Sequence, residues 1–134
     1  MKFTISVGKQ KKLGYTRNVS FKLRRRIHMK YISFAIPCYN SAAYMDRAVE
    51  SILKGGEDVE IIIVNDGSKD DTSKIAHEYE EKYPTIVRAV DKENGGHGDA
   101  VNAGLDHAEG KYFKVVDSDD WVDEEALYKI LDVL

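Results

Sequence analysis

Short, mostly apolar runs alternate with amphipathic segments along the sequence from residue 31 onward. Four such runs cover residues 32–36, 59–64, 86–90 and 112–116. Nearly unbroken apolar runs of this length are typical of strands that are covered on both faces, as in a parallel sheet. The sequence therefore predicts four buried strands, and we expect Pro37 to end the first of them.

The segments between these runs carry apolar side chains at helical spacing. Stripes of residues three and four positions apart occur within residues 45–53, 75–83, 101–108 and 127–134. This spacing gathers apolar side chains on one face of a helix. Glycine or proline follows each of the first three stripes, whereas the fourth reaches the last residue without a stop signal. We therefore expect the chain to be cut within a helix after the fourth strand.

Four alternations of strand and helix predict an α/β fold with a mostly parallel open sheet and helices on both faces. Ligands of such sheets bind beyond the carboxyl ends of the strands. Polar clusters follow the four predicted strands, at residues 37–40, 65–72, 91–99 and 117–120. The four loops are therefore expected to open on one edge of the sheet and to form one site.

The fourth cluster contains the strongest chemical signal. Asp117 and Asp119 are two residues apart at a strand end, so an extended backbone points both carboxylates to one side. Paired carboxylates are hard oxygen ligands, which suit Mg²⁺ or Mn²⁺ better than zinc. The alternative is that Asp119 or Asp120 caps a helix that begins near Asp123.

The second and third clusters offer groups that could bind a polar ligand. Asp66 lies at a strand end, where its carboxylate can accept an N–H group from a nucleobase. Asp70 and Asp71 are better suited to the start of the next helix, where acids satisfy free N–H groups. Residues 95–98 are glycine-rich before a helix and resemble a phosphate cradle, in which His97 either contacts substrate or faces solvent.

Composition and charge narrow the class of protein. The 134 residues are 43% hydrophobic, with one cysteine and no run of about 20 apolar residues. A membrane-spanning segment, an internal disulfide and a zinc cluster are therefore not expected, and neither is a secretory signal. The sequence predicts a cytoplasmic protein with no nucleic-acid partner.

The charge is unevenly distributed. Residues 1–28 contain nine Lys or Arg and no acid, while all 23 Asp and Glu follow, although the net charge is only −3. We interpret residues 1–28 as a basic, poorly ordered extension and residues 29–134 as the folded unit. The alternative is a basic arm that contacts a membrane surface, which would place the protein at the inner face of the plasma membrane.

The four polar loops together resemble the nucleotide-binding half of the family 2 glycosyltransferases, which have the Rossmann-like GT-A fold. The matching segments are residues 36–40, 64–68 with Asp70 and Thr72, 94–104, and 116–120, in the family's order. Each motif is weak alone, but the ordered set is specific. The Gly-Gly-His-Gly form looks most similar to enzymes of bacterial surface-polysaccharide synthesis.

The resemblance implies a role for each matching residue. Pro37 and Tyr39 would lie against the nucleotide base, Asp66 would accept the uracil N–H of a UDP-linked donor, and Asn94 would lie near the base or ribose. Asn102 is a further candidate contact to the nucleotide sugar. Asp117 and Asp119 would form the Asp-x-Asp motif: Asp117 would approach the ribose and the metal, and Asp119 would ligate the metal, Mg²⁺ or Mn²⁺.

The implied reaction is transfer of a sugar from a nucleotide-diphospho-sugar to a hydroxyl of a saccharide or lipid-linked acceptor. Many members carry Arg where this sequence has Val101, which puts one expected diphosphate contact in doubt. The family's general base lies in a second half, which we expect beyond residue 134, so no catalytic base is assigned. The alternative function is a non-catalytic module that binds a nucleotide or nucleotide sugar.

Overall fold

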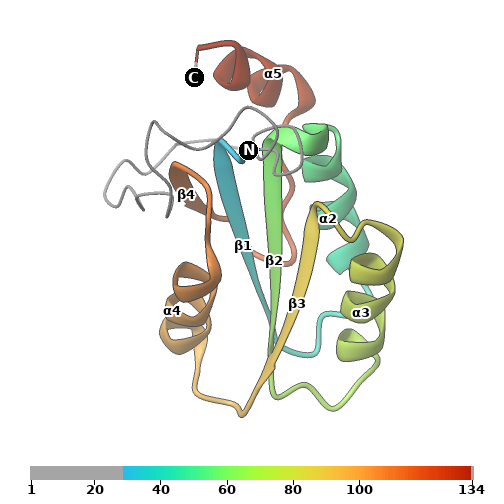
Figure 1. Cartoon of the computed structure of the whole chain (residues 1–134). Coiled ribbons are helices and arrows are strands. Elements are labelled where there is room, and N and C mark those ends of the chain that lie inside the picture. The colour runs from blue at the N-terminus through green and yellow to red at the C-terminus, as the bar shows by residue number, and fades with distance from the viewer. Residues whose placement is uncertain (1–28, 134) are drawn as a thin grey trace.

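A computed structural model describes residues 29–133 as one layered α/β unit (Figure 1). The strands are β1 (Ile32–Cys38), β2 (Val59–Asp66), β3 (Val87–Lys92) and β4 (Tyr112–Val115). The helices are α2 (Met45–Leu53), the short 3-10 helix η1 (Gly56–Asp58), α3 (Thr72–Lys82), α4 (His97–His107) and α5 (Glu124–Val133). The interpretation of residues 1–28 as a poorly ordered extension falls outside the described residues.

The four strands form one parallel sheet in the order β3-β2-β1-β4. Helices α2 and α3 cover one face and α4 covers the other, while α5 lies beyond the sheet, where β1 and β2 begin (Figure 1). The predicted parallel open sheet with helices on both faces is confirmed. Because all four strands run the same way, the loops that follow them emerge at the opposite end from α5.

Two apolar clusters hold the layers together. The larger joins β1 and β2 to α2, α3 and α5, and it includes Phe34, Ile52 and Leu127, none of which is exposed. Burying side chains of this size contributes about 1.5–3 kcal/mol each. The smaller cluster packs α4 on the other face through Ile62, Val64, Ala100 and Ala108. The small side chains of Ala100 and Ala108 let α4 approach the sheet closely.

The structure shifts some predicted strand boundaries. β2 continues to Asp66, and β3 runs from Val87 to Lys92. The prediction that Pro37 ends the first strand is wrong, because β1 continues to Cys38. Pairing with β4 stops at Ala35 opposite Val115. Within the described sheet, Pro37 therefore has a neighbouring strand on one side only, and its missing N–H group breaks no hydrogen bond to β4.

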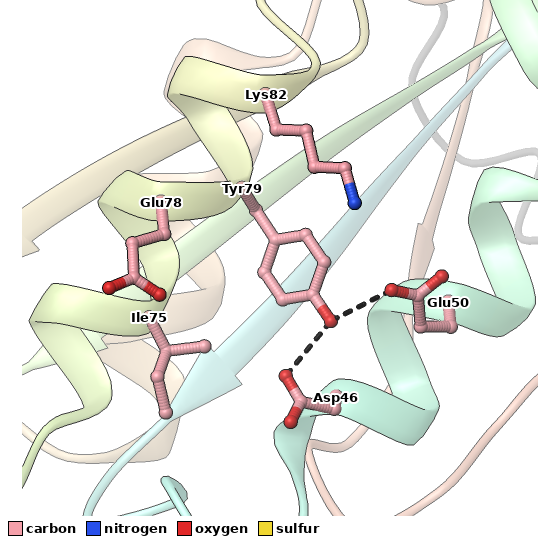
Figure 2. A pocket seen from close by; sticks show the side chains of 6 residues that line it. All are labelled: Asp46, Glu50, Ile75, Glu78, Tyr79 and Lys82. Carbon is pink, nitrogen blue, oxygen red and sulfur yellow. Dashed lines mark hydrogen bonds between the residues drawn. The ribbon is translucent and has the colours of Figure 1, made fainter.

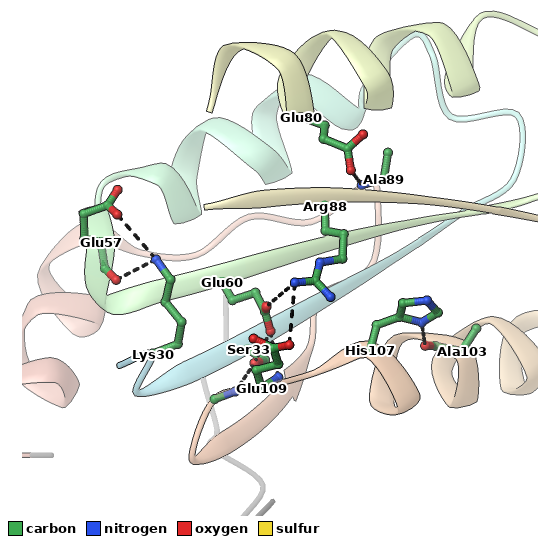
Figure 3. A network of polar contacts seen from close by, with 11 residues as sticks. Lys30, Ser33, Glu57, Glu60, Glu80, Arg88, Ala89, Ala103, His107 and Glu109 are labelled. Atoms are coloured by element: carbon green, nitrogen blue, oxygen red, sulfur yellow. Dashed lines mark hydrogen bonds and ion pairs between the residues drawn. The ribbon is translucent and has the colours of Figure 1, made fainter. Parts of the chain in front are cut away.

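A buried polar network fastens the turn between α4 and β4 to the sheet (Figure 3). The Ser33 hydroxyl donates to Glu60 Oε1 (2.7 Å), which also accepts the N–H group of Glu109 (2.9 Å). The Gly110 N–H group donates to Ser33 Oγ (2.8 Å), and Arg88 lies 3.8 Å from Glu60 Oε2. Since Ser33 and Glu60 are buried, these partners compensate for the cost of burying polar groups.

Candidate functional site

Hydrogen bonds from Asn40 and Ser41 join the loop after β1 to the loop after β2. The Asn40 N–H group donates to Ser68 Oγ (2.9 Å), and Asn40 Oδ1 accepts from the Lys69 N–H group (2.8 Å). The Ser41 N–H group donates to Thr72 Oγ1 (2.9 Å). Asn40 has a positive φ of 51°, a conformation that asparagine tolerates better than most residues. These contacts fix the two loops relative to each other.

Asp66 organises the loop after β3. Its carboxylate accepts the N–H groups of Gly95 (2.8 Å, to Oδ1) and Gly96 (3.0 Å, to Oδ2), and its carbonyl accepts from Asn94 Nδ2 (3.1 Å). Gly67 makes this approach possible, because a Cβ there would lie 2.7 Å from the backbone nitrogen of Asn94. The structure thus brings Asp66 and Asn94, both predicted site residues, into direct contact.

The Asp66 side chain is buried and carries its charge there. Burial raises the pKa of this carboxyl, but the hydrogen bonds from Gly95, from the ammonium group of Lys92 (3.0 Å) and from Gly96 outweigh that effect. The net result is a pKa below the ordinary value of an aspartic acid. Asp66 is therefore an ionised acceptor at neutral pH, which is the form needed to receive an N–H group of a ligand.

The loop after β4 is fastened to α2 and to the loop between β1 and α2. The hydroxyl groups of Ser118 and Ser41 lie 2.8 Å apart. The Arg47 guanidinium stacks 3.4 Å from the centre of the Trp121 ring. The Val122 N–H group donates to Ser51 Oγ (2.9 Å). The segment that contains Asp117 and Asp119 is thereby held on α2 as well as on β4.

Asp117 and Asp119 both expose their side chains. Asp117 Oδ1 lies 4.0 Å from Nε2 of His97 at the start of α4. Within residues 29–133, the Asp119 carboxylate accepts no hydrogen bond and forms no ion pair. Asp123 is the residue that caps α5, since its Oδ2 accepts the Ala126 N–H group (3.0 Å). The alternative that Asp119 serves as the helix cap is therefore not supported.

Two exposed carboxylates at one strand end fit a hard divalent cation by their chemistry. No group of three or more His, Cys, Asp or Glu that could hold a metal ion occurs in the described part of the chain. A cation on Asp117 and Asp119 would therefore keep most of its coordination positions for water or for ligand oxygens. This is the usual way in which Mg²⁺ is bound beside phosphate groups.

The remaining predicted site residues differ in their placement. Pro37 is buried within β1, and Tyr39, directly after the strand, is half-exposed. Asn102 is exposed on α4 and, within the described chain, makes no hydrogen bond to another predicted site residue. Cys38 is buried, and burial raises the pKa of its thiol to about 12, so it is no nucleophile.

Sequence reasoning missed two residues that organise the site. Lys92 binds Asp66 across 26 positions, and Arg47 stacks on Trp121. Neither Lys92 nor Arg47 belongs to a recognisable motif. A single basic residue also forms no repeating sequence pattern from which such a contact could be predicted. His97 was considered, and its position beside Asp117 places it on the same rim as the acidic pair.

A separate cavity of about 260 Å³ lies between α2 and α3 (Figure 2). It is lined by Asp46, Glu50, Ile75, Glu78, Tyr79 and Lys82. The Tyr79 hydroxyl lies 2.9 Å from Asp46 and 3.1 Å from Glu50, and burial together with these carboxylates raises its pKa. None of the predicted site residues lines this cavity, so it is distinct from the loops at the carboxyl ends of the strands.

The part of the chain that contains these four loops matches a known protein family. The profile described as "Glycosyl transferase family 2" matches residues 33–134, which include all four loops. The chain belongs to glycosyl transferase family 2. None of the helices between residues 29 and 133 is long and apolar enough to cross a membrane.

Relatives of this family 2 member include proteins of known and unknown role. It is 40% identical over 102 residues to the minor teichoic acid biosynthesis protein GgaB of Bacillus subtilis, covering 74% of this chain and 11% of that protein. It is 42% identical over 99 residues to the uncharacterized glycosyltransferase RP339 of Rickettsia prowazekii, covering 73% and 30%. The chain therefore spans less than a third of either relative.

Solved structures confirm the GT-A fold of this family 2 chain. Staphylococcus aureus TarS 1-349 in complex with UDP-GlcNAc is 31% identical with a TM-score of 0.67, covering 76% of this chain and 30% of that one. The mannosyltransferase PcManGT of Pyrobaculum calidifontis, in complex with GDP-Man and Mn²⁺, has a TM-score of 0.67 at 23% identity and covers 78% and 32%. The second likeness concerns the fold alone.

Proposed function

We propose that residues 29–134 are the donor-binding half of a metal-assisted glycosyltransferase of bacterial cell-surface polysaccharide synthesis. The donor is a nucleotide-diphospho-sugar, and the acceptor is a hydroxyl group of a saccharide or lipid-linked molecule. The observation that carries the proposal is the exposed acidic pair Asp117 and Asp119 on a loop that is tied to the loops around Asp66. Kinship with a teichoic acid biosynthesis protein supports the pathway class.

Asp66 supports uracil as the base of the donor. A carboxylate offers about four acceptor positions, and Lys92, Gly95 and Gly96 occupy three of them. With respect to the described residues, one position therefore remains, on Oδ2, for an N–H group of a ligand. Uracil presents a single N–H group on its ring edge, whereas guanine presents two adjacent N–H donors. The complex of TarS with UDP-GlcNAc is in keeping with this assignment.

The other predicted residues surround this contact. Tyr39, together with Pro37 in β1, would lie against the base, and Asn94 would lie near the base or the ribose. Asn102 is exposed on α4 and is proposed as a further contact to the nucleotide sugar. Asp117 would approach both the ribose and the cation.

Asp117 and Asp119 would hold Mg²⁺ or Mn²⁺. When bound, the cation supplies Lewis-acid stabilisation of the negative charge that develops on the departing nucleoside diphosphate. The contribution of the chain itself is to position two ionised carboxylates on a loop fastened by Ser118, Trp121 and Val122. A rigidly held acidic pair would not have to reorganise when the diphosphate arrives.

The test is calorimetric titration of the 134-residue chain with UDP in the presence and absence of Mn²⁺. We expect Asp119→Ala to abolish the Mn²⁺-dependent part of UDP binding. Asp120→Ala is the matched control, because Asp120 is the next acid along and its Oδ1 accepts the neighbouring Trp121 N–H group (2.8 Å). Unchanged Mn²⁺-dependent binding in Asp119→Ala would contradict the metal assignment.

A second measurement separates an enzyme from a binding module. Release of free sugar from a UDP-linked donor, or its transfer to an acceptor, indicates catalysis by the chain as it stands. UDP and Mn²⁺ binding without turnover would favour the module instead. The donor-binding assignment is common to both outcomes.

A further inference from the structure

Lys92 lies at the centre of the contacts between β2, β3 and α4. Its ammonium group lies 3.0 Å from Asp66 Oδ1, donates to the carbonyl of Glu93 (2.5 Å) and contacts Asp99 Oδ2. An ammonium group has three protons, so these three acceptors use its full donor capacity. The side chain is only 19% exposed, which keeps water from competing for the same positions.

The three contacts form a closed cluster around Gly95. A Cβ at Gly95 would lie 3.0 Å from Lys92 Nζ and would collide with the Asp99 carboxylate. The loop backbone therefore passes directly beside the ion pair, and Gly95 donates its own N–H group to Asp66 Oδ1. Lys92 and Gly95 together occupy Oδ1, while Oδ2 accepts, from residues 29–133, only the Gly96 N–H group.

This uneven occupancy has a consequence for the choice of base. With Lys92 in place, a ligand can donate one N–H group to Asp66, at Oδ2. Without Lys92, Oδ1 would regain one acceptor position, and Asp66 could receive two adjacent N–H groups, one on each oxygen. That paired pattern matches the ring N–H and exocyclic amino group of guanine, and uracil has no counterpart to it.

We propose that Lys92 is a specificity-determining residue that restricts Asp66 to bases with a single N–H donor and so disfavours guanosine nucleotides. The proposal rests on the proposed function, because it takes Asp66 as the acceptor for the base. Asp99 acts as a positioning residue, since its carboxylate is a second ionic partner of the Lys92 ammonium group.

The test compares UDP and GDP as ligands of the 134-residue chain by calorimetry with Mn²⁺ present. We expect wild type to bind UDP more tightly than GDP, and Lys92→Met to reduce the ratio of the two affinities about tenfold, the size of one hydrogen bond to a charged group. Lys92→Arg retains a cationic donor and should keep the preference for UDP. Lys129→Met removes a lysine from an exposed position on α5 and should leave the ratio unchanged.

Asp99→Asn keeps the proposal testable if Lys92→Met fails to fold. This variant leaves Lys92 in place but removes its second carboxylate partner, so the ratio should fall by a smaller factor. A UDP-to-GDP ratio that is unchanged in a folded Lys92→Met or Asp99→Asn variant would overturn the role of Lys92. Failure of wild type to bind either nucleotide would instead overturn the proposed function, so the two failures are distinguishable.

Discussion

Gly104→Ala tests how closely α4 packs on the sheet. A Cβ at Gly104 would lie 2.6 Å from the Cβ of Ala35, whereas carbon atoms in contact prefer about 3.5–4.0 Å. Ala35 cannot easily retreat, because it is fully buried in β1 and paired with Ile62 on one side and Val115 on the other. The added methyl group must therefore push α4 away from β1 by about 1 Å.

Two opposing effects determine the magnitude. Overpacking a core costs about 1–3 kcal/mol, and replacing glycine by alanine within a helix returns about 0.8–1.0 kcal/mol. The net effect of Gly104→Ala is therefore a loss of about 1 kcal/mol in the free energy of unfolding. For a folded unit of this size, that corresponds to a decrease of about 5 °C in Tm.

Gly98→Ala in the same helix is the matched control. A Cβ at Gly98 meets no atom of the described part of the chain within 4 Å, so the helix preference remains, weakened because Gly98 is in the first turn. We expect a gain of a few tenths of a kcal/mol, measured for both variants by thermal and urea unfolding followed by circular dichroism. Equal or greater stability of Gly104→Ala relative to wild type would refute the close approach of α4 to β1.

Two further perturbations test the polar contacts. Glu60→Ala leaves the Ser33 hydroxyl and the Glu109 N–H group without their acceptor, and it should lower the free energy of unfolding by about 2–4 kcal/mol. Glu60→Gln retains an acceptor oxygen, so it should lose less than half as much stability in urea titrations. Equal losses in the two variants would argue against this network. The hydrogen bond to Asp91 (2.6 Å) raises the pKa of His77. The contribution of this pair to folding stability is therefore complete below about pH 6.5 and is lost as the pH rises through the raised pKa. His77 is about half-exposed, so wild type should exceed His77→Gln by about 0.2–1 kcal/mol at pH 5.5 and by less at pH 9; a difference independent of pH would contradict the ion pair.

The strands and helices were predictable because their signal is local. The apolar run of residues 59–64 and the stripe of residues 45–53 report burial and period within a few positions of sequence. The error at Pro37 arose because its tolerance depends on where β4 stops, some 78 positions later in the chain. No pattern around Pro37 itself contains that information.

The site was predictable as a set of loops but not as a set of contacts. The rule for parallel sheets placed Asp66, Asn94, Asp117 and Asp119 at strand ends, and the structure ties their loops together. The hydrogen bond between Ser41 and Ser118 joins residues 77 positions apart, and the ammonium group of Lys92 contacts Asp66 because tertiary packing brings β3 beside β2. Contacts of this kind follow from the finished fold, so they become visible only after the layers are assembled.

The loop after β4, which carries Asp117 and Asp119, is attached to α2, although the two segments are far apart in the sequence. β4 contributes only four residues, while Arg47 and Ser51 of α2, and Ser41 just before it, hold the loop in place. Local opening of α2 would release the loop that carries Asp117 and Asp119 even with the sheet intact, because parts of a protein can open locally without unfolding the whole structure. Substitutions on α2 that loosen this attachment are therefore expected to weaken the proposed cation site, although they change neither aspartate.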